Sequence, residues 1–109
     1  MSWPHLIAWF FGGAVFANAI PHWVAGAMGR PFQSPFAKPP GEGFSSSTTN
    51  VLWGGFNLGI AYLLLVRVGD FNIRDPAAAG TAGLGGLLLT LATARRFGRF
   101  NGGALPTAG

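Results

Sequence analysis

The amino-acid sequence predicts an all-α integral membrane protein with three transmembrane helices. Only ten of its 109 residues are charged, or 9%, whereas an ordinary soluble domain carries about 25%. Half of the residues are apolar, and the mean hydropathy is +0.40. The charged residues leave three long uncharged stretches, at residues 1–29, 43–66 and 76–94. Since a helix of about 20 residues crosses a hydrocarbon core of about 30 Å, we expect three spans in a single domain, residues 1–109.

The first span is expected over residues 4–28, with a bend at Pro21. Residues 6–20 are apolar apart from Asn18, but this stretch alone is short for a bilayer. A proline inside a helix removes one backbone donor and kinks or ends the helix. The alternative is therefore a short span that ends before Pro21. A cleaved signal peptide is disfavoured, because residues 1–5 contain no Lys or Arg.

The other two spans have clear starting signals. The second is expected over residues 47–66, after a run of Ser and Thr at 45–49 that can cap a helix. The third is expected over residues 76–94, because Asp75 places a capping carboxylate directly before Pro76. Both spans therefore have a residue that fixes where the helix begins.

The segment 30–46 joins the first two spans and is rich in proline and phenylalanine. Such a composition favours an extended, polyproline-like backbone with exposed rings. We expect a loop that rests on the membrane or covers the helices, and the alternative is a segment that binds a partner. The small, uncharged tail at residues 101–109 is expected to be mobile.

The basic residues predict how the chain is oriented. With three spans, the first loop and the C-terminal tail share one side, which holds Arg30, Lys38, Arg95, Arg96 and Arg99. The other side holds only Arg67 and Arg74. Because cytoplasmic loops carry the excess of Lys and Arg, we expect a cytoplasmic C-terminus, an external N-terminus and basic anchors at the membrane surface. Anchors of this kind explain the net charge of +4 without a nucleic-acid partner.

Three polar residues are expected at depth in the membrane: Asn18, His22 and Asn57. Asn18 and His22 are four residues apart and share one helical face if the helix continues through Pro21. The structural interpretation is that one of them bonds to Asn57 or to backbone freed by Pro21. The functional interpretation is a pathway or ligand site, because buried polar residues in membranes often mark one.

The same inventory limits the chemistry. The spans hold no Asp or Glu, and this absence disfavours proton-coupled transport. The serines belong to no nucleophile motif, so we do not expect the protein to be an enzyme. His22 could hold a tetrapyrrole through a ring nitrogen, but two histidines and no cysteine offer few further ligands. We therefore expect neither a metal nor a cofactor.

Small residues at helical spacing predict close helix packing. Such faces let helix backbones approach each other in a membrane. The predicted packing residues are Gly55, Gly59, Ala78, Ala82 and Gly86. They serve packing within the chain, or packing against another subunit or further copies of the chain.

Two short motifs carry a resemblance to known proteins. Residues 18–24 read Asn-Ala-Ile-Pro-His-Trp-Val, and residues 50–54 read Asn-Val-Leu-Trp-Gly. Together they resemble a group of small bacterial membrane proteins of uncharacterised function. The resemblance implies a bacterial inner-membrane protein of about this size, and it implies no activity or substrate.

These observations lead to two functional hypotheses. The first is a structural or accessory protein that packs against other membrane subunits. The second is a homo-oligomeric transporter or channel, in which copies of the chain pool Asn18, His22 and Asn57 around a polar path.

Overall fold

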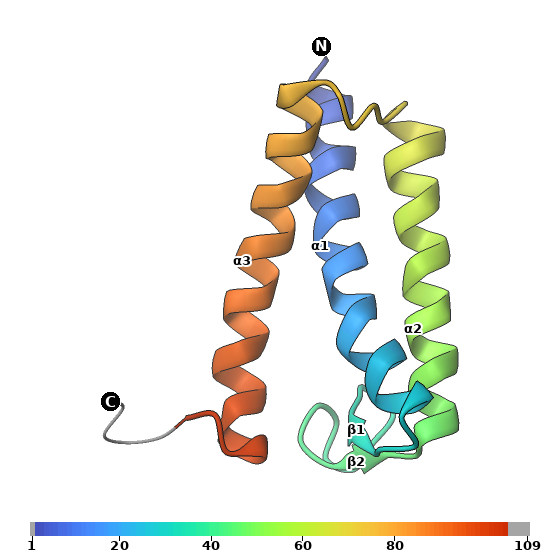
Figure 1. The fold of residues 1–109 in the computed structure, drawn as a ribbon, viewed down its shortest axis with the longest axis vertical. Coiled ribbons are helices and arrows are strands. Elements are labelled where there is room, and N and C mark those ends of the chain that lie inside the picture. Colours follow the sequence, from blue (N-terminus) through green and yellow to red (C-terminus); the bar gives the residue numbers. More distant parts are fainter. Residues whose placement is uncertain (1, 105–109) are drawn as a thin grey trace.

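The computed structural model describes residues 2–104 and contains three long helices. Within these residues, each of three helical segments is long and apolar enough to cross a membrane, which confirms the predicted fold class. The connection between the first two helices contains a two-stranded sheet, which lies at one end of the molecule (Figure 1). The elements are α1 (Trp3–Ala27), β1 (Phe32–Gln33), β2 (Phe44–Ser45), α2 (Ser47–Tyr62), the π-helix η1 (Leu63–Val68) and α3 (Pro76–Asn101).

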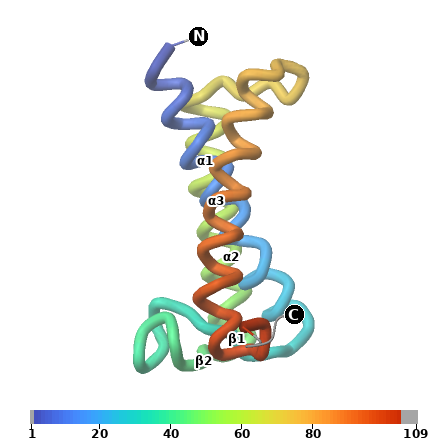
Figure 2. Tube along the Cα trace, turned by 90° about the vertical axis from the view of Figure 1, so that its left-hand side faces the viewer, coloured from blue at the N-terminus to red at the C-terminus, as the bar shows by residue number. Residues whose placement is uncertain are grey.

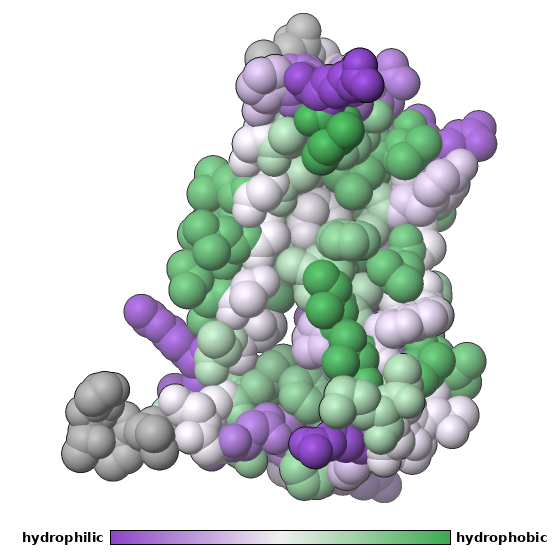
Figure 3. Space-filling view, viewed as in Figure 1, coloured by the Kyte–Doolittle hydropathy of each residue, from purple (hydrophilic) through white to green (hydrophobic). Residues whose placement is uncertain are grey.

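Helix α1 is the central element of the fold. It packs against both α2 and α3, whereas α2 and α3 make few contacts with each other. Figures 1 and 2 show that α1 runs obliquely between them, so that its C-terminal turns approach the start of α2 and diverge from the end of α3. In Figure 3 the hydrophobic residues of the visible face gather in the middle, and hydrophilic residues gather towards the two ends.

Helix α1 runs through Pro21 without a break. Ser2 caps its N-terminus, because the Ser2 hydroxyl accepts a hydrogen bond from the backbone N–H of His5 at 3.4 Å. Helix α1 therefore continues past Pro21, and the alternative of a short helix that ends before Pro21 is wrong. The carbonyl of Ala17, four residues before the proline, receives no helical N–H at this point.

The other two spans begin where the sequence predicts, but both extend further than predicted. Ser46 caps α2 and Asp75 caps α3, each through a bond from its side chain to a backbone N–H. Helix α3 continues past residue 94 to Asn101, and its C-cap is Gly102 with a φ of 87°. Arginine is a good helix former, and nothing breaks the helix before Gly102, so α3 extends beyond the predicted span of residues 76–94.

Residues 30–46, which we call the proline loop, form a small hairpin rather than free polyproline-like chain. Strands β1 and β2 pair antiparallel, with Phe32 opposite Ser45 and Gln33 opposite Phe44. The prolines at 35, 39 and 40 lie between the strands, where no ladder hydrogen bond is needed. Pairing of the two strands provides hydrogen-bond partners for backbone groups that a single extended chain would leave without partners. Of the predicted mobile tail, Asn101 ends α3, and residues 105–109 lie outside the described part of the chain.

Candidate functional site

Asn50, in the first turn of α2, joins the proline loop to the helices. Its side chain is completely buried. Its Nδ2 group donates towards the carbonyl oxygens of Phe32 and Ser45, both at 3.2 Å, and of Ser46 at 3.0 Å. Because all three neighbours are acceptors, they fix the orientation of the amide, and Oδ1 is left to accept from elsewhere.

That remaining acceptor binds His22 of α1. The distance from His22 Nδ1 to Asn50 Oδ1 is 2.8 Å, and the imidazole is 2% exposed. Since Oδ1 can only accept, Nδ1 carries the hydrogen, and Nε2 of the neutral ring is an acceptor. The rings of Phe32 and Trp53 flank the imidazole edge-on, at centroid distances of 5.3 and 6.4 Å.

A second polar pair lies deeper in the membrane. Asn18 Nδ2 donates to Asn57 Oδ1 at 3.1 Å, and Asn57 Nδ2 donates to the backbone carbonyl of Trp53 at 2.8 Å. Of the two residues expected to reach Asn57, the structure gives this bond to Asn18 and pairs His22 with Asn50 instead. No hydrogen bond to Asn18 Oδ1 comes from residues 2–104, so this oxygen is a free acceptor there.

The two pairs border a cavity of about 290 Å³, which we call the polar chamber. It lies beneath the proline loop, between the C-terminal half of α1, the start of α2 and the end of α3. Its lining residues are Asn18, His22, Ser34, Pro35, Pro40, Gly41, Trp53, Arg96 and Phe97. Asn18 and His22 share one face of α1, as predicted, and both line the chamber. Asn57 does not line the chamber and lies further from the proline loop.

The polar chamber has unused hydrogen-bonding groups of both kinds. The Arg96 guanidinium, which extends towards Gly41, donates, while His22 Nε2 and Asn18 Oδ1 accept. The Trp53 indole nitrogen has no partner within residues 2–104, but it is buried away from the surface of the cavity. Its described lining contains no Asp or Glu. The chamber is therefore suited to an anionic group that also carries a hydroxyl.

Metal coordination has little support in this site. Within residues 2–104 no group of three or more His, Cys, Asp or Glu side chains could hold a metal ion. His22 alone offers Nε2. For a tetrapyrrole the surroundings fit poorly, because the imidazole is buried between two aromatic rings and the chamber is small.

A second cavity borders the chamber at Asn18 and lies further from the proline loop. This mid-membrane slot has a volume of about 510 Å³ and lies where α2 and α3 fail to meet. Its lining residues are Phe10, Phe11, Ala14, Val15, Asn18, Asn57, Gly85, Leu88 and Leu89. Asn18 lines both the slot and the chamber, which makes the two cavities neighbours.

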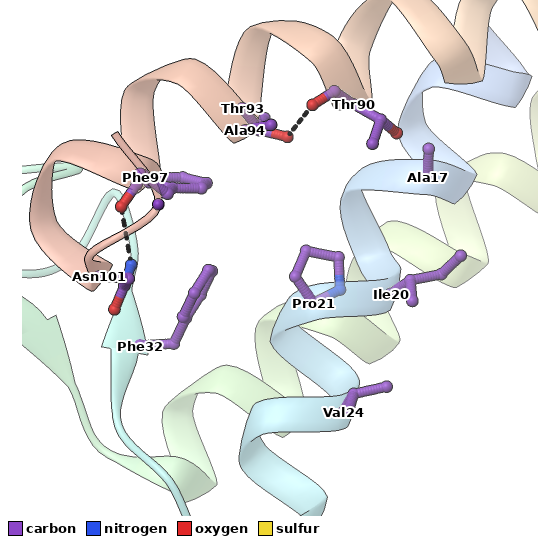
Figure 4. A pocket seen from close by; sticks show the side chains of 12 residues that line it. Ala17, Ile20, Pro21, Val24, Phe32, Thr90, Thr93, Ala94, Phe97 and Asn101 are labelled. Atoms are coloured by element: carbon purple, nitrogen blue, oxygen red, sulfur yellow. Dashed lines mark hydrogen bonds between the residues drawn. The ribbon is translucent and has the colours of Figure 1, made fainter. Parts of the chain in front are cut away.

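A third cavity, which we call the lateral hollow, lies between α1 and α3 (Figure 4). Its volume is about 540 Å³, and Pro21, Ile20 and Val24 are its lining residues from the C-terminal half of α1. Phe32 and Phe97, whose ring centroids are 5.1 Å apart, stand at its loop end. Because Phe97 also lines the chamber, this aromatic pair separates the apolar hollow from the polar groups.

Small residues bring α3 against α1, as predicted. Ala78 is completely buried, and a β-carbon on Gly13 of α1 would collide with the backbone carbonyl of Ala82. A β-carbon on Gly86 would come within 3.3 Å of the Gly13 oxygen. Gly85 also lies at this close approach, because a β-carbon on Gly85 would collide with the backbone of α1. The predicted spacing of four residues does not include Gly85.

On α2 the close contact is made by a different glycine from the predicted pair. A β-carbon on Gly54 would lie 2.8 Å from the backbone nitrogen of Trp23 and 3.1 Å from the carbonyl oxygen of Ala19. One on Gly55 would touch only the Trp23 ring, at 3.4 Å, and one on Gly59 would meet nothing within 4 Å. Gly59 therefore has no role in packing within the described chain.

The predicted basic anchors lie at the two ends of the molecule, and all of them are exposed. The loop end holds Glu42 and the larger group of basic residues, while the opposite end has equal numbers of acidic and basic residues. The net positive charge is therefore confined to the loop end. The basic residues at that end are Arg30, Lys38, Arg95, Arg96 and Arg99, and those at the other end are Arg67 and Arg74.

Fold and site together define a three-helix membrane protein with a polar chamber near one membrane surface. Comparison with protein-family models, curated proteins and solved structures finds no match. The function must therefore be argued from the residues that line the cavities.

Proposed function

We propose that this chain is an accessory protein of the bacterial inner membrane whose polar chamber binds an anionic group. The observation that carries the proposal is the Arg96 guanidinium in a chamber that also holds His22 and whose described lining contains no carboxylate. Without a carboxylate beside it in the described lining, the guanidinium can form charge-assisted hydrogen bonds with an anionic group.

The accessory role is supported by the surfaces that the fold leaves open. Gly59 on α2 and Gly80 and Gly83 on α3 have room for a β-carbon within the chain, so a helix of another membrane protein could approach them closely. The concentration of positive charge at the loop end supports a cytoplasmic position for that end.

A homo-oligomeric transporter or channel is the alternative function. It requires several copies to pool Asn18, His22 and Asn57 around one path. Within a single chain, however, Asn18 already bonds to Asn57 and His22 already bonds to Asn50. Purification in mild detergent separates the hypotheses: a stoichiometric membrane-protein partner supports the accessory role, and a closed ring of identical chains would contradict it.

The chamber is tested with a matched pair of arginine variants. Phosphatidylglycerol and phosphatidylcholine are titrated in neutral detergent, and binding is followed by native mass spectrometry and by thermal unfolding. Arg96→Gln should weaken phosphatidylglycerol binding about tenfold, because a charge-assisted bond is lost. Arg95→Gln removes the same charge from an exposed neighbour that does not line the chamber, and should change binding by less than about twofold.

Equal effects of the two arginine variants would show that surface charge alone attracts the lipid, and would overturn the proposed function.

A further inference from the structure

We propose that the polar chamber and the mid-membrane slot together bind one single-chain anionic glycerophospholipid. Its phosphate and glycerol would lie in the chamber, and its acyl chain would lie along the slot. The inference rests on the proposed function of the chamber and adds the class of ligand and its position in the molecule.

The two cavities have the arrangement that such a ligand needs. The slot lies beside the middle of α1, between Phe10 and Asn18, while the chamber extends from Asn18 to the proline loop. A molecule that fills both therefore lies along the helices, with its head towards the membrane surface at the loop end. Apart from Asn18 and Asn57, the slot is lined by apolar residues, which suit an acyl chain.

The unused polar groups favour a phosphate ester of glycerol over a simple carboxylate. The Arg96 guanidinium carries several N–H donors, and a phosphate offers several acceptor oxygens for them. His22 Nε2 and Asn18 Oδ1 both accept, so they require a ligand that donates. A glycerol hydroxyl supplies that donor, whereas an ionised fatty acid supplies none.

One acyl chain is placed in the slot because Asn18, whose amide is part of the polar layer between α1 and α2, lines both the slot and the chamber. The lateral hollow also borders the chamber, at Phe97, but the Phe32–Phe97 pair stands between the hollow and the polar groups. The hollow therefore serves as an internal control, because it is apolar, of similar size, and outside the proposed path.

The position of the chain is tested by photochemical crosslinking. A lysophosphatidylglycerol with a diazirine in its acyl chain is added to the purified protein in phosphatidylcholine vesicles, and the crosslinked residues are identified by mass spectrometry. Crosslinks should concentrate on slot residues such as Val15 and Leu88. Crosslinks that concentrate in the lateral hollow, or that are spread evenly over the lipid-facing surface, would overturn the inference.

Two variants that add the same bulk provide the control. Val15→Trp fills the slot and should remove most of the slot labelling, whereas Ala94→Trp fills the lateral hollow and should leave it unchanged. Thermal unfolding of both variants checks that they fold. If either variant fails to fold, the crosslink positions in the unaltered chain still decide the question.

The identity of the headgroup is tested separately, by competition with a fatty acid. Oleate, which has one chain and a carboxylate but no hydroxyl, should compete at least about tenfold more weakly than unlabelled lysophosphatidylglycerol. Equal competition would overturn the glycerophospholipid assignment. If Arg96-dependent lipid binding persists while crosslinks fall outside the slot, this inference fails and the proposed function stands. If binding does not depend on Arg96, the proposed function itself fails.

Discussion

At the scale of single residues, Asn50 resolves the main difficulty of burying polar groups in an apolar environment. Its amide pairs with three backbone carbonyls of the loop and α2 cap and with the imidazole of His22. Without Asn50, His22 Nδ1 would be buried without a partner, at a cost of about 1–3 kcal/mol. Because Nδ1 of His22 is used in this way, only Nε2 is left for a ligand.

Replacing Asn50 should therefore cost much of the stability. Asn50→Leu has nearly the same shape but removes every bond, and we expect the free energy of unfolding to fall by about 3 kcal/mol or more. The measurement is an unfolding titration in mixed detergent micelles. Asn72→Leu makes the same change at an exposed loop residue whose Oδ1 accepts one bond, from the Arg74 backbone N–H, and should lower the free energy of unfolding by about 1 kcal/mol or less. A similar small loss for both variants would contradict the role assigned to Asn50.

The sequence predicts part of this site. The spacing of four between Asn18 and His22 is enough to place both on one face, and both do line the chamber. Their partners are not predictable in the same way, because pairing across helices depends on how far one helix is shifted along the other. Asn50 and Asn57 are two turns apart on α2, and only the packed structure decides which of them His22 meets.

At the scale of helices, α1 makes almost all the packing, and its glycines set how closely α3 approaches. A membrane offers no hydrophobic driving force between helices, so close van der Waals contact has to supply the stability. Gly13 is such a contact, because its Cα faces the backbone of Ala82 with no room for a side chain. Gly59 on α2 is also a glycine, but a β-carbon there would have no neighbouring atom within 4 Å.

This contrast gives a matched pair of alanine substitutions. Gly13→Ala should lower the free energy of unfolding by about 1–3 kcal/mol, because the added methyl group forces α3 away. Gly59→Ala adds the same methyl group without a clash and should raise helix stability by up to about 1 kcal/mol. Unfolding titrations in mixed micelles measure both. Equal and small effects would mean that α1 and α3 do not pack as closely as described.

Element starts were more predictable than element ends or loop structure. Capping residues mark the starts, and Ser46 and Asp75 both act as the sequence suggests. The predicted end of the third span rests on Arg95 and Arg96, which close the uncharged stretch, but a helix stops only where its backbone is interrupted, which here is at Gly102. The hairpin of the proline loop depends on the pairing of residues 32–33 with 44–45, a contact that no local pattern reveals.

At the scale of the whole molecule, the two ends differ both in structure and in charge. The chamber, the hairpin and Arg96 lie at the loop end, where the net positive charge is concentrated. An anionic headgroup from the adjacent leaflet would meet a favourable electrostatic potential on its way to the chamber. The orientation in the bilayer therefore also decides which leaflet supplies the ligand.

The orientation is open to direct measurement, since the sequence contains no cysteine. Asn72→Cys lies in the connection between η1 and α3, and Glu42→Cys lies in the proline loop at the other end; both positions are exposed. In intact bacterial cells with a permeabilised outer membrane, an impermeant maleimide should label the Asn72→Cys variant and not the Glu42→Cys variant. The Glu42→Cys variant should react only after the inner membrane is opened. The reverse pattern would place the chamber at the outer surface of the inner membrane, and labelling of both variants from one side would mean that α2 does not cross it.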